Sequence, residues 1–295
     1  NILIKDAATL EQTSKIQAVV LDKTGTLTEG KPRITDVVTV NNFDRNELLR
    51  LAAATETGSN HPLSGAVVAA AKQKKLDVPS NITGFNSIAG HGVEAKVGNK
   101  AVLIGTAKLM RDREVDTAAL TQKMTRLLDE GKTLMIVAVN NALAGVIGVQ
   151  DPVKPSAKKA IERMKELDLE VAMITGDNQK TAEAIAEQLG IERVFAEVLP
   201  EDKASYIKKL QAEGKFVAMV GDGVNDAPAL AQADIGIAIG AGTDVAVETA
   251  HVVLMKSDPL DILRAIQLSK ATVRKMKQNL AWASVYNLAA IPIAA

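Results

Sequence analysis

Three short apolar runs, each followed by an acidic loop, constrain the fold of this 295-residue chain more than any other feature. The runs cover residues 18–21, 170–174 and 216–220, and the first acidic residues after them are Asp22, Asp177 and Asp222. Short, continuous apolar runs are typical of strands that are buried on both faces of a parallel sheet. Ligands of such sheets bind beyond the carboxyl ends of the strands, so the three loops predict one shared site.

Helical patterns lie between these apolar runs. They cover residues 156–167, 179–189 and 201–211, and Gly190 and Gly214 stand where the caps of helix C-termini are expected. Repeated alternation of strand and helix predicts a parallel α/β sheet with right-handed crossover connections.

Residues 33–150 do not continue this alternation. The segment opens with an alternating apolar run at Ile34, Val37 and Val40, and two strands flank Asn140-Asn141. Between them lie helical patterns at residues 45–57, 61–75 and 117–128, and short strand patterns at residues 92–97 and 101–104. Neighbouring strands joined by short turns favour an antiparallel sheet with helices packed on it.

These patterns predict two domains. The α/β domain is discontinuous and consists of residues 1–32 and 151–278. An α+β domain of residues 33–150 is inserted into it. The connections at Lys31-Pro32 and Asp151-Pro152 are the expected hinges.

Composition excludes several classes of function. The 35 basic and 35 acidic residues give a net charge of zero, which argues against a protein that binds nucleic acid by broad phosphate neutralisation. Aromatic residues make up only 2% of the chain, so stacking platforms for single strands are poorly supplied. The absence of Cys excludes disulfides, thiolate catalysis and Cys-ligated metal sites.

The end of the sequence carries a different signal. No charged residue follows Lys277, and residues 270–277 include four basic side chains. A bilayer span needs about 20 apolar residues, and basic residues flank such spans on the cytoplasmic side. We therefore expect residues 279–295 to form either part of a transmembrane helix or a buried C-terminal helix, and we expect the chain to be a piece of a longer protein.

Asp22 opens the segment DKTGTLT, directly after the first apolar run. A carboxylate in this position can attack phosphorus and form an aspartyl phosphate. Thr26 can donate a hydrogen bond to a phosphoryl oxygen. Lys203, near the start of a predicted helix, can place a cation on the same group.

Two further loops supply groups suited to phosphate chemistry. Asp222 and Asp226 carry the oxygen atoms that a hard cation such as Mg²⁺ prefers. Thr175-Gly176-Asp177 offers a hydroxyl and backbone amides to a phosphate. A single Asp after a strand is more often a turn or cap residue, but three acidic loops at one sheet edge favour a site for phosphoryl transfer.

The strings DKTGTLT, TGDN and GDGVNDAPAL, in this order and spacing, resemble the phosphorylation domain of P-type ATPases, whose catalytic domain belongs to the haloacid-dehalogenase superfamily. The resemblance implies a haloacid-dehalogenase-like parallel sheet in which Asp22 is phosphorylated. Thr175, Asp177 and Lys203 would complete the catalytic site. A Mg²⁺ ion would be held by Asp22, Thr24 and Asp222.

The resemblance extends into the inserted domain. SNHPL at residues 59–63 and GHG at residues 90–92 are similar to signatures of the heavy-metal-transporting subgroup, although Asn60 stands where an acidic residue is frequent. Taken alone, the first string is typical of a helix start and the second of a turn. In that subgroup the inserted domain binds ATP, which implies contacts with the nucleotide by Glu56, His61, Gly90 and Gly92 around the adenine and ribose, and by Thr26, Gly176 and Asn225.

The cargo can be inferred only from the end of the chain. Asn279, Tyr286-Asn287 and Pro292 resemble in their spacing the membrane helix that follows the phosphorylation domain in transporters of monovalent copper or silver. Tyr286 and Asn287 are therefore candidate ligands of the transported ion. The resemblance also implies a membrane-bound pump whose domains in this chain face the cytoplasm, with an actuator domain and further transmembrane helices as partners.

Three alternatives stay open. A soluble Mg²⁺-dependent phosphatase of the superfamily would typically carry a second Asp where this chain has Thr24, and a hydroxyl cannot act as a general base at neutral pH. A pump for a divalent ion such as zinc would usually place a Lys in the following membrane helix, and no Lys follows Lys277. A nucleotide-binding module without turnover would not need Asp22, Lys203 and Asp222.

Overall fold

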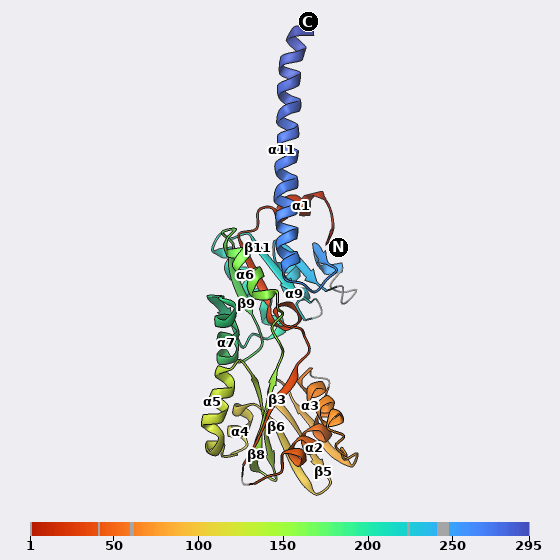
Figure 1. The fold of residues 1–295 in the computed structure, drawn as a ribbon, viewed down its shortest axis with the longest axis vertical. Coiled ribbons are helices and arrows are strands. Elements are labelled where there is room, and N and C mark those ends of the chain that lie inside the picture. Colours follow the sequence, from red (N-terminus) through yellow and green to blue (C-terminus); the bar gives the residue numbers. More distant parts are fainter. Residues whose placement is uncertain (1, 41, 60–61, 223–224, 241–247, 295) are drawn as a thin grey trace. The chain divides into compact units, whose positions relative to one another are not determined.

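The computed structural model describes residues 2–40, 42–59, 62–222, 225–240 and 248–294, and the chain divides into two compact units (Figure 1). The first, which we call the Asp22 unit, contains residues 1–28, 153–176 and 186–295. The second, which we call the inserted unit, contains residues 29–152 and 177–185. The assignment of these units to phosphorylation and to nucleotide binding stays a prediction.

A seven-stranded sheet forms the centre of the Asp22 unit, in the order β1-β13-β12-β11-β2-β9-β10. Its strands are β1 (Ile2–Ile4), β2 (Ala18–Asp22), β9 (Glu170–Ile174), β10 (Arg193–Phe195), β11 (Val217–Gly221), β12 (Ile235–Ile239) and β13 (Val252–Leu254). All neighbouring strands are parallel except β1, which pairs with β13 in the antiparallel sense at one edge. The strands that precede the three acidic loops, β11, β2 and β9, are direct neighbours.

Helices cover this sheet because its central strands are apolar on both faces. They are α1 (Ala7–Thr13), α6 (Ala157–Lys165), α8 (Lys203–Ala212), α9 (Ala227–Gln232) and α11 (Leu260–Ala294), with short turns η1 (Lys23–Leu27) and η3 (Pro200–Asp202). Ile207 and Leu210 of α8 share a buried cluster with Val20 and Met219 of the sheet. Helix α6 packs against β9 and α11. Helix α7 (Gln179–Leu189) has residues in both units.

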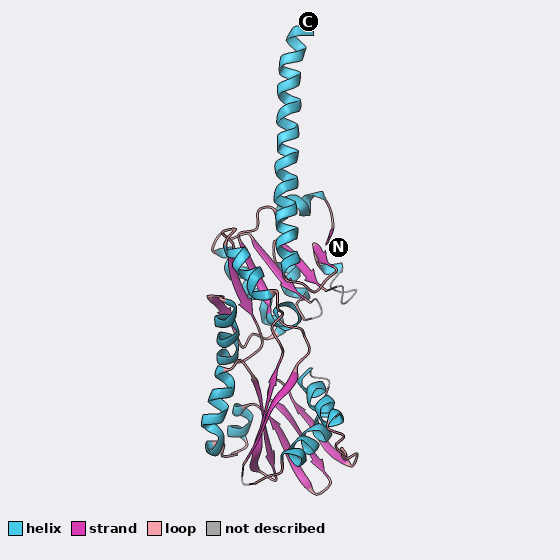
Figure 2. Ribbon diagram, in the orientation of Figure 1, coloured by secondary structure: helices cyan, strands magenta, loops and turns pink. Residues whose placement is uncertain are grey.

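An antiparallel six-stranded sheet, in the order β3-β8-β7-β6-β5-β4, forms the inserted unit (Figure 2). Its strands are β3 (Arg33–Thr39), β4 (Ile82–Ile88), β5 (Gly92–Val97), β6 (Lys100–Gly105), β7 (Thr133–Val139) and β8 (Ala142–Gln150). Its helices are α2 (Arg45–Glu56), α3 (Pro62–Gln73), α4 (Ala107–Asp112) and α5 (Thr121–Asp129), with the turn η2 (Ala118–Leu120). The predicted fold class, a haloacid-dehalogenase-like α/β sheet with an antiparallel α+β insertion, is confirmed.

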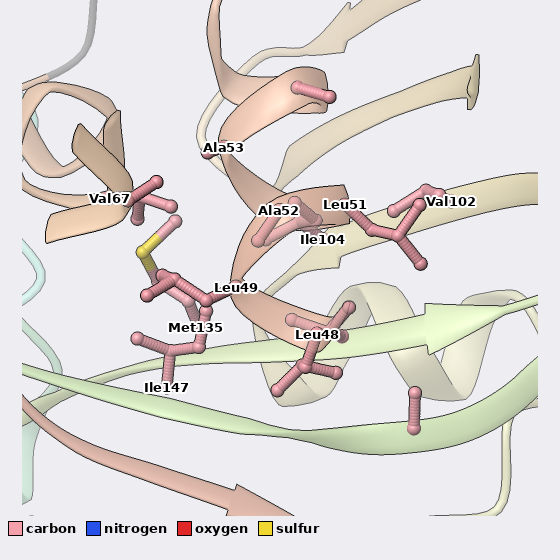
Figure 3. Close-up of a cluster of buried hydrophobic side chains, with 14 of the residues drawn as sticks. Leu48, Leu49, Leu51, Ala52, Ala53, Val67, Val102, Ile104, Met135 and Ile147 are labelled. Carbon is pink, nitrogen blue, oxygen red and sulfur yellow. The ribbon is translucent and has the colours of Figure 1, made fainter. Parts of the chain in front are cut away.

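Helix α2 supplies much of the core of the inserted unit (Figure 3). The Asp44 side chain caps it by accepting a hydrogen bond from the Glu47 amide. Apolar side chains of α2 pack with α3 and with one face of the sheet, and the cluster includes Leu48, Leu49, Leu51, Val67, Val102, Ile104, Met135 and Ile147. A second cluster around Met110, Leu127 and Ile136 joins helices α4 and α5 to the sheet.

The observed elements differ from the predicted segments mainly at their ends. The predicted helix 201–211 begins with η3 at Pro200 and continues as α8, and the predicted helix 117–128 begins with η2 and continues as α5. Gly190 and Gly214 have φ angles of 73° and 81°, which confirms their role at helix C-termini. Several elements have no predicted counterpart: β1, α1, β4, α4, β10, α9, β12 and β13. For β4 the reason is that five of its residues are exposed and no apolar pattern marks it.

Helix α11 runs for 35 residues from Leu260. Its beginning packs on α1 and α6, whereas the large apolar side chains of Leu280, Trp282 and Leu288 are exposed. Among the described residues, no helix carries an apolar stretch that is long enough to cross a membrane. The assignment of residues 279–295 to part of a transmembrane helix stays a prediction.

Leu48→Ala should destabilise the inserted unit by about 2–5 kcal/mol, because removal of a fully buried side chain leaves a cavity. Hydrogen exchange of the β7 and β8 amides measures the change, since it reports on the inserted sheet alone. Leu199→Ala is the control, because this side chain is 53% exposed. Equal exchange rates in the two variants would contradict the core described here.

Candidate functional site

Asp22 is the last residue of β2, and the turn η1 folds back directly after it. The Thr28 amide donates to the Lys23 carbonyl at 3.0 Å, and the Thr28 hydroxyl donates to the same oxygen at 3.1 Å. Gly25 has a φ angle of 74°, a conformation that favours glycine. The turn therefore holds Asp22 at the carboxyl edge of the central strand.

Lys203 joins two buried carboxylates at this edge. Its Nζ lies 2.7 Å from Asp22 Oδ1 and 2.6 Å from Asp226 Oδ1, and all three side chains are buried. Lys203 is the first residue of α8, and Asp226 directly precedes α9. Three segments that are far apart in the sequence thus form one cluster of charges, which we call the Asp22 cluster.

The cluster changes the proton affinity of its members. Burial, and then repulsion from Asp226, raise the pKa of Asp22 to about 7, although Lys203 opposes the change. Burial disfavours the charge of Lys203, but attraction by Asp22 and Asp226 raises its pKa above the ordinary value. Burial and Asp226 also raise the pKa of Asp222. Perturbed groups of this kind are frequent at functional sites.

Two glycines allow the acidic side chains to approach this edge closely. A Cβ atom on Gly221 would lie 2.3 Å from Asp226 Oδ2, so only glycine leaves room for the Asp226 carboxylate. A Cβ atom on Gly25 would lie 3.0 Å from Asp222 Oδ2. The glycines of DKTGTLT and of GDGVNDAPAL are therefore part of the site, since they admit the carboxylates that surround it.

Thr26 fits the predicted role of a phosphate ligand. Its Oγ1 is buried and has no hydrogen-bond partner within the described residues, so it can donate to a phosphoryl oxygen. Thr24, on the same turn, is exposed.

The other predicted residues of this site differ in their exposure to solvent. Asn225, next to Asp226, is exposed. Thr175 is buried directly after β9, and Gly176 is exposed beside it. Asp177, which directly follows Gly176, is the first residue of the stretch 177–185 that groups with the inserted unit, and its catalytic role stays a prediction.

The carboxylates at this edge fit the chemistry of a hard cation, but Asp226 is not available as a further ligand. No group of three Asp, Glu, His or Cys side chains that could hold a metal occurs in the described ranges. Asp226, a candidate cation ligand by residue type, binds Lys203 instead. Mg²⁺ needs only one or two carboxylates when it also binds phosphate. Asp22, Asp222 and Thr24 thus stay the predicted set.

A cavity of about 220 Å³ lies in the inserted unit. Its lining includes Glu56, Gly90 and Gly92, three of the four residues predicted to surround adenine and ribose. The fourth, His61, lies outside the described residues. The end of α2 and the turn before β5 are distant in the sequence, and tertiary structure brings them to one cavity.

Glu56 is buried at the end of α2 and lines this cavity. The Ser64 hydroxyl donates to Glu56 Oε2 and lies 2.9 Å from the Ser59 hydroxyl. Burial raises the pKa of Glu56, and the hydrogen bond from Ser64 opposes this. Sequence reasoning missed Ser64, and its place directly after SNHPL is the signal that could have found it.

The two glycines of GHG have different reasons to be glycine. A Cβ atom on Gly90, which has a φ angle of 71°, would meet no atom within 4 Å, so this backbone borders open space. A Cβ atom on Gly92 would lie 2.1 Å from the Ile104 carbonyl oxygen and 2.6 Å from Gly105 Cα. Gly92 is thus required for the contact between β5 and β6, whereas Gly90 is accessible to a ligand.

Tyr286 and Asn287 lie on the exposed part of α11. The Tyr286 side chain is 72% exposed. Figure 1 shows that this end of the helix projects away from the sheet of the Asp22 unit. The predicted ion ligands are therefore not brought together with the Asp22 cluster.

Asp226→Asn should lower the pKa of Asp22 from its value of about 7, because it removes the repulsion that Asp226 exerts. Carboxyl NMR titration of the metal-free chain measures this shift. A raised carboxyl pKa means that the folded chain holds this proton more tightly than the unfolded chain, so the associated stability is present at low pH and is lost as pH rises through about 7. The variant should lose less stability over that range, and an unchanged titration would contradict the described cluster.

Gly90→Ala and Gly92→Ala should differ in their effect on stability. Gly90→Ala should cost about 1–2 kcal/mol, the strain of an L-residue in the left-handed region. Gly92→Ala should cost more, because its Cβ collides with the backbone of β6. Hydrogen exchange of the β5 and β6 amides compares the two, and similar effects would show that the strands do not need Gly92.

The amino-acid sequence from residue 16 to residue 234 matches the family of haloacid dehalogenase-like hydrolases. The chain is 51% identical over 294 residues to a copper-exporting P-type ATPase of Bacillus subtilis (strain 168), and 49% identical over 295 residues to one of Staphylococcus aureus (strain JH9). Each match covers 100% of this chain and 36% of the relative. The chain therefore spans about a third of the length of these curated relatives.

Solved structures agree with these matches. A zinc-transporting PIB-type ATPase in the E2.Pi state has a TM-score of 0.75 and 37% identity, and the match covers 100% of this chain and 48% of that chain. The catalytic domain of a CPx-ATPase has a TM-score of 0.69 and 29% identity, and covers 90% of this chain and 95% of that one. The resemblance carried by DKTGTLT, TGDN and GDGVNDAPAL is thus confirmed, and the chain belongs to the haloacid dehalogenase-like hydrolase family.

Proposed function

We propose that this chain is the ATP-hydrolysing part of a P-type ATPase that transports copper(I) or silver(I) and forms an aspartyl phosphate at Asp22. The observation that carries the proposal is the buried contact of Lys203 with Asp22 at the start of DKTGTLT. The similarity of the whole chain to copper-exporting P-type ATPases supports the same function.

In the proposed reaction, a carboxylate oxygen of Asp22 attacks the γ-phosphorus of ATP. The bond between this oxygen and phosphorus forms as the bond from the γ-phosphorus to the β–γ bridging oxygen breaks, and ADP leaves. Lys203 orients the carboxylate by holding Oδ1, and its charge offsets that of the phosphoryl oxygens. Thr26 donates its hydroxyl to one of these oxygens, and Thr175 and Asp177 complete the proposed catalytic set.

Mg²⁺, when bound, neutralises charge on the transferred phosphoryl group. Asp22, Asp222 and Thr24 are the residues proposed to hold it. Asp22 must be ionised in order to attack, and burial and repulsion from Asp226, which raise its pKa, oppose this ionisation until a further cation approaches.

The inserted unit is proposed to bind the adenosine part of ATP. Its cavity of about 220 Å³ is smaller than the roughly 300–1,000 Å³ of typical small-molecule sites, so it suits a base and sugar better than a whole nucleotide. Glu56 offers a carboxylate oxygen to an exocyclic amine, and Gly90 lets a ligand approach the backbone. His61 is proposed beside them, and Gly176 and Asn225 are proposed to contact the phosphates.

Sequence identity favours copper or silver as the cargo. The copper-exporting relatives are 51% and 49% identical to the chain, whereas the zinc-transporting structure is 37% identical.

Thr24 stands where a soluble phosphatase of this superfamily would carry its second Asp, which argues against free phosphatase activity. Transport would take place in the membrane and would require an actuator domain and further transmembrane helices, with Tyr286 and Asn287 as proposed ion ligands.

The chain incubated with radiolabelled ATP and Mg²⁺ should acquire an acid-stable label that hydroxylamine removes, the behaviour of an acyl phosphate. Asp22→Asn should abolish the label, because an amide cannot form the acyl phosphate. Asp168→Asn makes the same chemical change at an exposed position and should keep the label. A label that persists in Asp22→Asn, or that maps to another residue of the unmodified chain, would overturn the proposal.

A further inference from the structure

Lys154 is a buried lysine beneath the turn that follows Asp22. Its Nζ donates to the Gly25 carbonyl at 2.5 Å, to the Thr26 carbonyl at 2.9 Å and to the Ser257 hydroxyl at 2.7 Å. Lys154 is not among the candidate site residues that the sequence predicts. Three segments of the Asp22 unit therefore meet at one ammonium group.

The contacts of Lys154 are well suited to fixing the turn. A buried ammonium is costly unless hydrogen bonds compensate for the loss of water, and two of the three oxygens that do so belong to consecutive peptides of η1. These peptides flank Thr26, the proposed phosphate ligand. Displacement of the turn would break charge-assisted hydrogen bonds in a buried place, so Lys154 opposes movement of Thr26 relative to Asp22.

The backbone around Lys154 ties it to the same turn. The Lys154 amide donates to the Leu27 carbonyl at 2.9 Å, and Val153 pairs with Thr28 in an antiparallel bridge. Both the main chain and the side chain of this segment thus hold the residues that follow Asp22. The ammonium position is set by backbone pairing rather than by a flexible surface loop.

Ser257 connects this ammonium to the start of α11. Its hydroxyl also lies 3.3 Å from the Gly25 carbonyl, and Gly240 packs on it, since a Cβ there would lie 3.3 Å from Ser257 Cβ. The next residue, Asp258, caps α11: its side chain accepts from the Leu260 amide at 3.0 Å, and its carbonyl from the Asp261 amide at 2.9 Å. Only a few residues therefore separate the contact with Lys154 from the first turn of the helix.

We propose that Lys154 is a positioning residue that holds the Gly25 and Thr26 carbonyls and, through Ser257, couples the turn after Asp22 to the first turn of α11. The inference rests on the proposed function, because it assumes that the turn receives a phosphoryl group. Movement of the Thr26 peptide upon phosphorylation would displace the Lys154 ammonium and with it Ser257. The helix that projects from the Asp22 unit would thus respond to the state of Asp22.

Hydrogen exchange of the full chain with and without Mg²⁺ and beryllium fluoride, an analogue of the aspartyl phosphate, tests this coupling. In the unmodified chain we expect slower exchange both at residues 22–28 and at residues 256–263. Ser257→Ala should keep the protection at residues 22–28 and lose it at residues 256–263. Lys154→Met should lose the protection at residues 256–263 and weaken the protection at residues 22–28. Lys158→Met, at an exposed position of α6, should behave as the unmodified chain.

The outcomes separate the two hypotheses. Absence of protection at residues 22–28 in the unmodified chain would overturn the proposed function itself. Protection at residues 22–28 that does not extend to residues 256–263, or that extends there equally in Ser257→Ala, would overturn the coupling alone. If Lys154→Met does not fold, Ser257→Ala still decides, because it removes one hydroxyl and leaves the ammonium with its two carbonyls.

A rate measurement distinguishes positioning from a merely structural role. Lys154→Met should slow the labelling of Asp22 by radiolabelled ATP about tenfold or more, the loss expected when hydrogen bonds to a charged group are removed. The ATP concentration that gives half-maximal labelling should not change, because the inserted unit is untouched. A change in that concentration alone, with the rate unaffected, would contradict the proposal.

Discussion

The buried contact of Lys203 with Asp22 and Asp226 is the interaction on which the arrangement of the candidate site, and therefore the proposed chemistry, depends. Removal of one partner from such a group leaves an unpaired charge away from water, which costs several kcal/mol. The sheet, the first residue of α8 and the residue before α9 must therefore keep their relative positions. Gly221 belongs to the same constraint, because only glycine admits the Asp226 carboxylate.

The two units form their candidate sites by different physical means. The Asp22 unit gathers opposite charges at the carboxyl edge of a mainly parallel sheet, where strand ends leave space for side chains. The inserted unit instead leaves a cavity beside an antiparallel sheet, bordered by glycine backbone and by the buried carboxylate of Glu56. The first arrangement suits attack on phosphorus, and the second suits recognition of a flat, largely apolar base.

Sequence reasoning succeeded where short-range patterns determine structure. The apolar runs at residues 18–21, 170–174 and 216–220 correspond to strands β2, β9 and β11, because short continuous apolar runs followed by loops suit strands that are buried on both faces of a sheet. Prediction from the sequence was less successful where the two partners of a contact are distant along the chain. Residue type alone suggests Asp226 as a cation ligand, but Lys203 binds it. No pattern in the sequence marks Lys154, whose contacts with Gly25 and Thr26 join residues far apart in the chain.

The sequence by itself thus determined the fold class, the three strands that precede the acidic loops with the helices between them, and the positions of Asp22, Lys203 and Asp222 in the chain. Tertiary structure decided which groups touch. It assigned Asp226 to Lys203, placed Glu56 and Gly90 on one cavity, and brought the Lys154 ammonium to the carbonyls of Gly25 and Thr26. The physical reason is that local patterns record burial and backbone preference, whereas hydrogen bonds and ion pairs between distant segments depend on side-chain positions that exist only after the chain has packed.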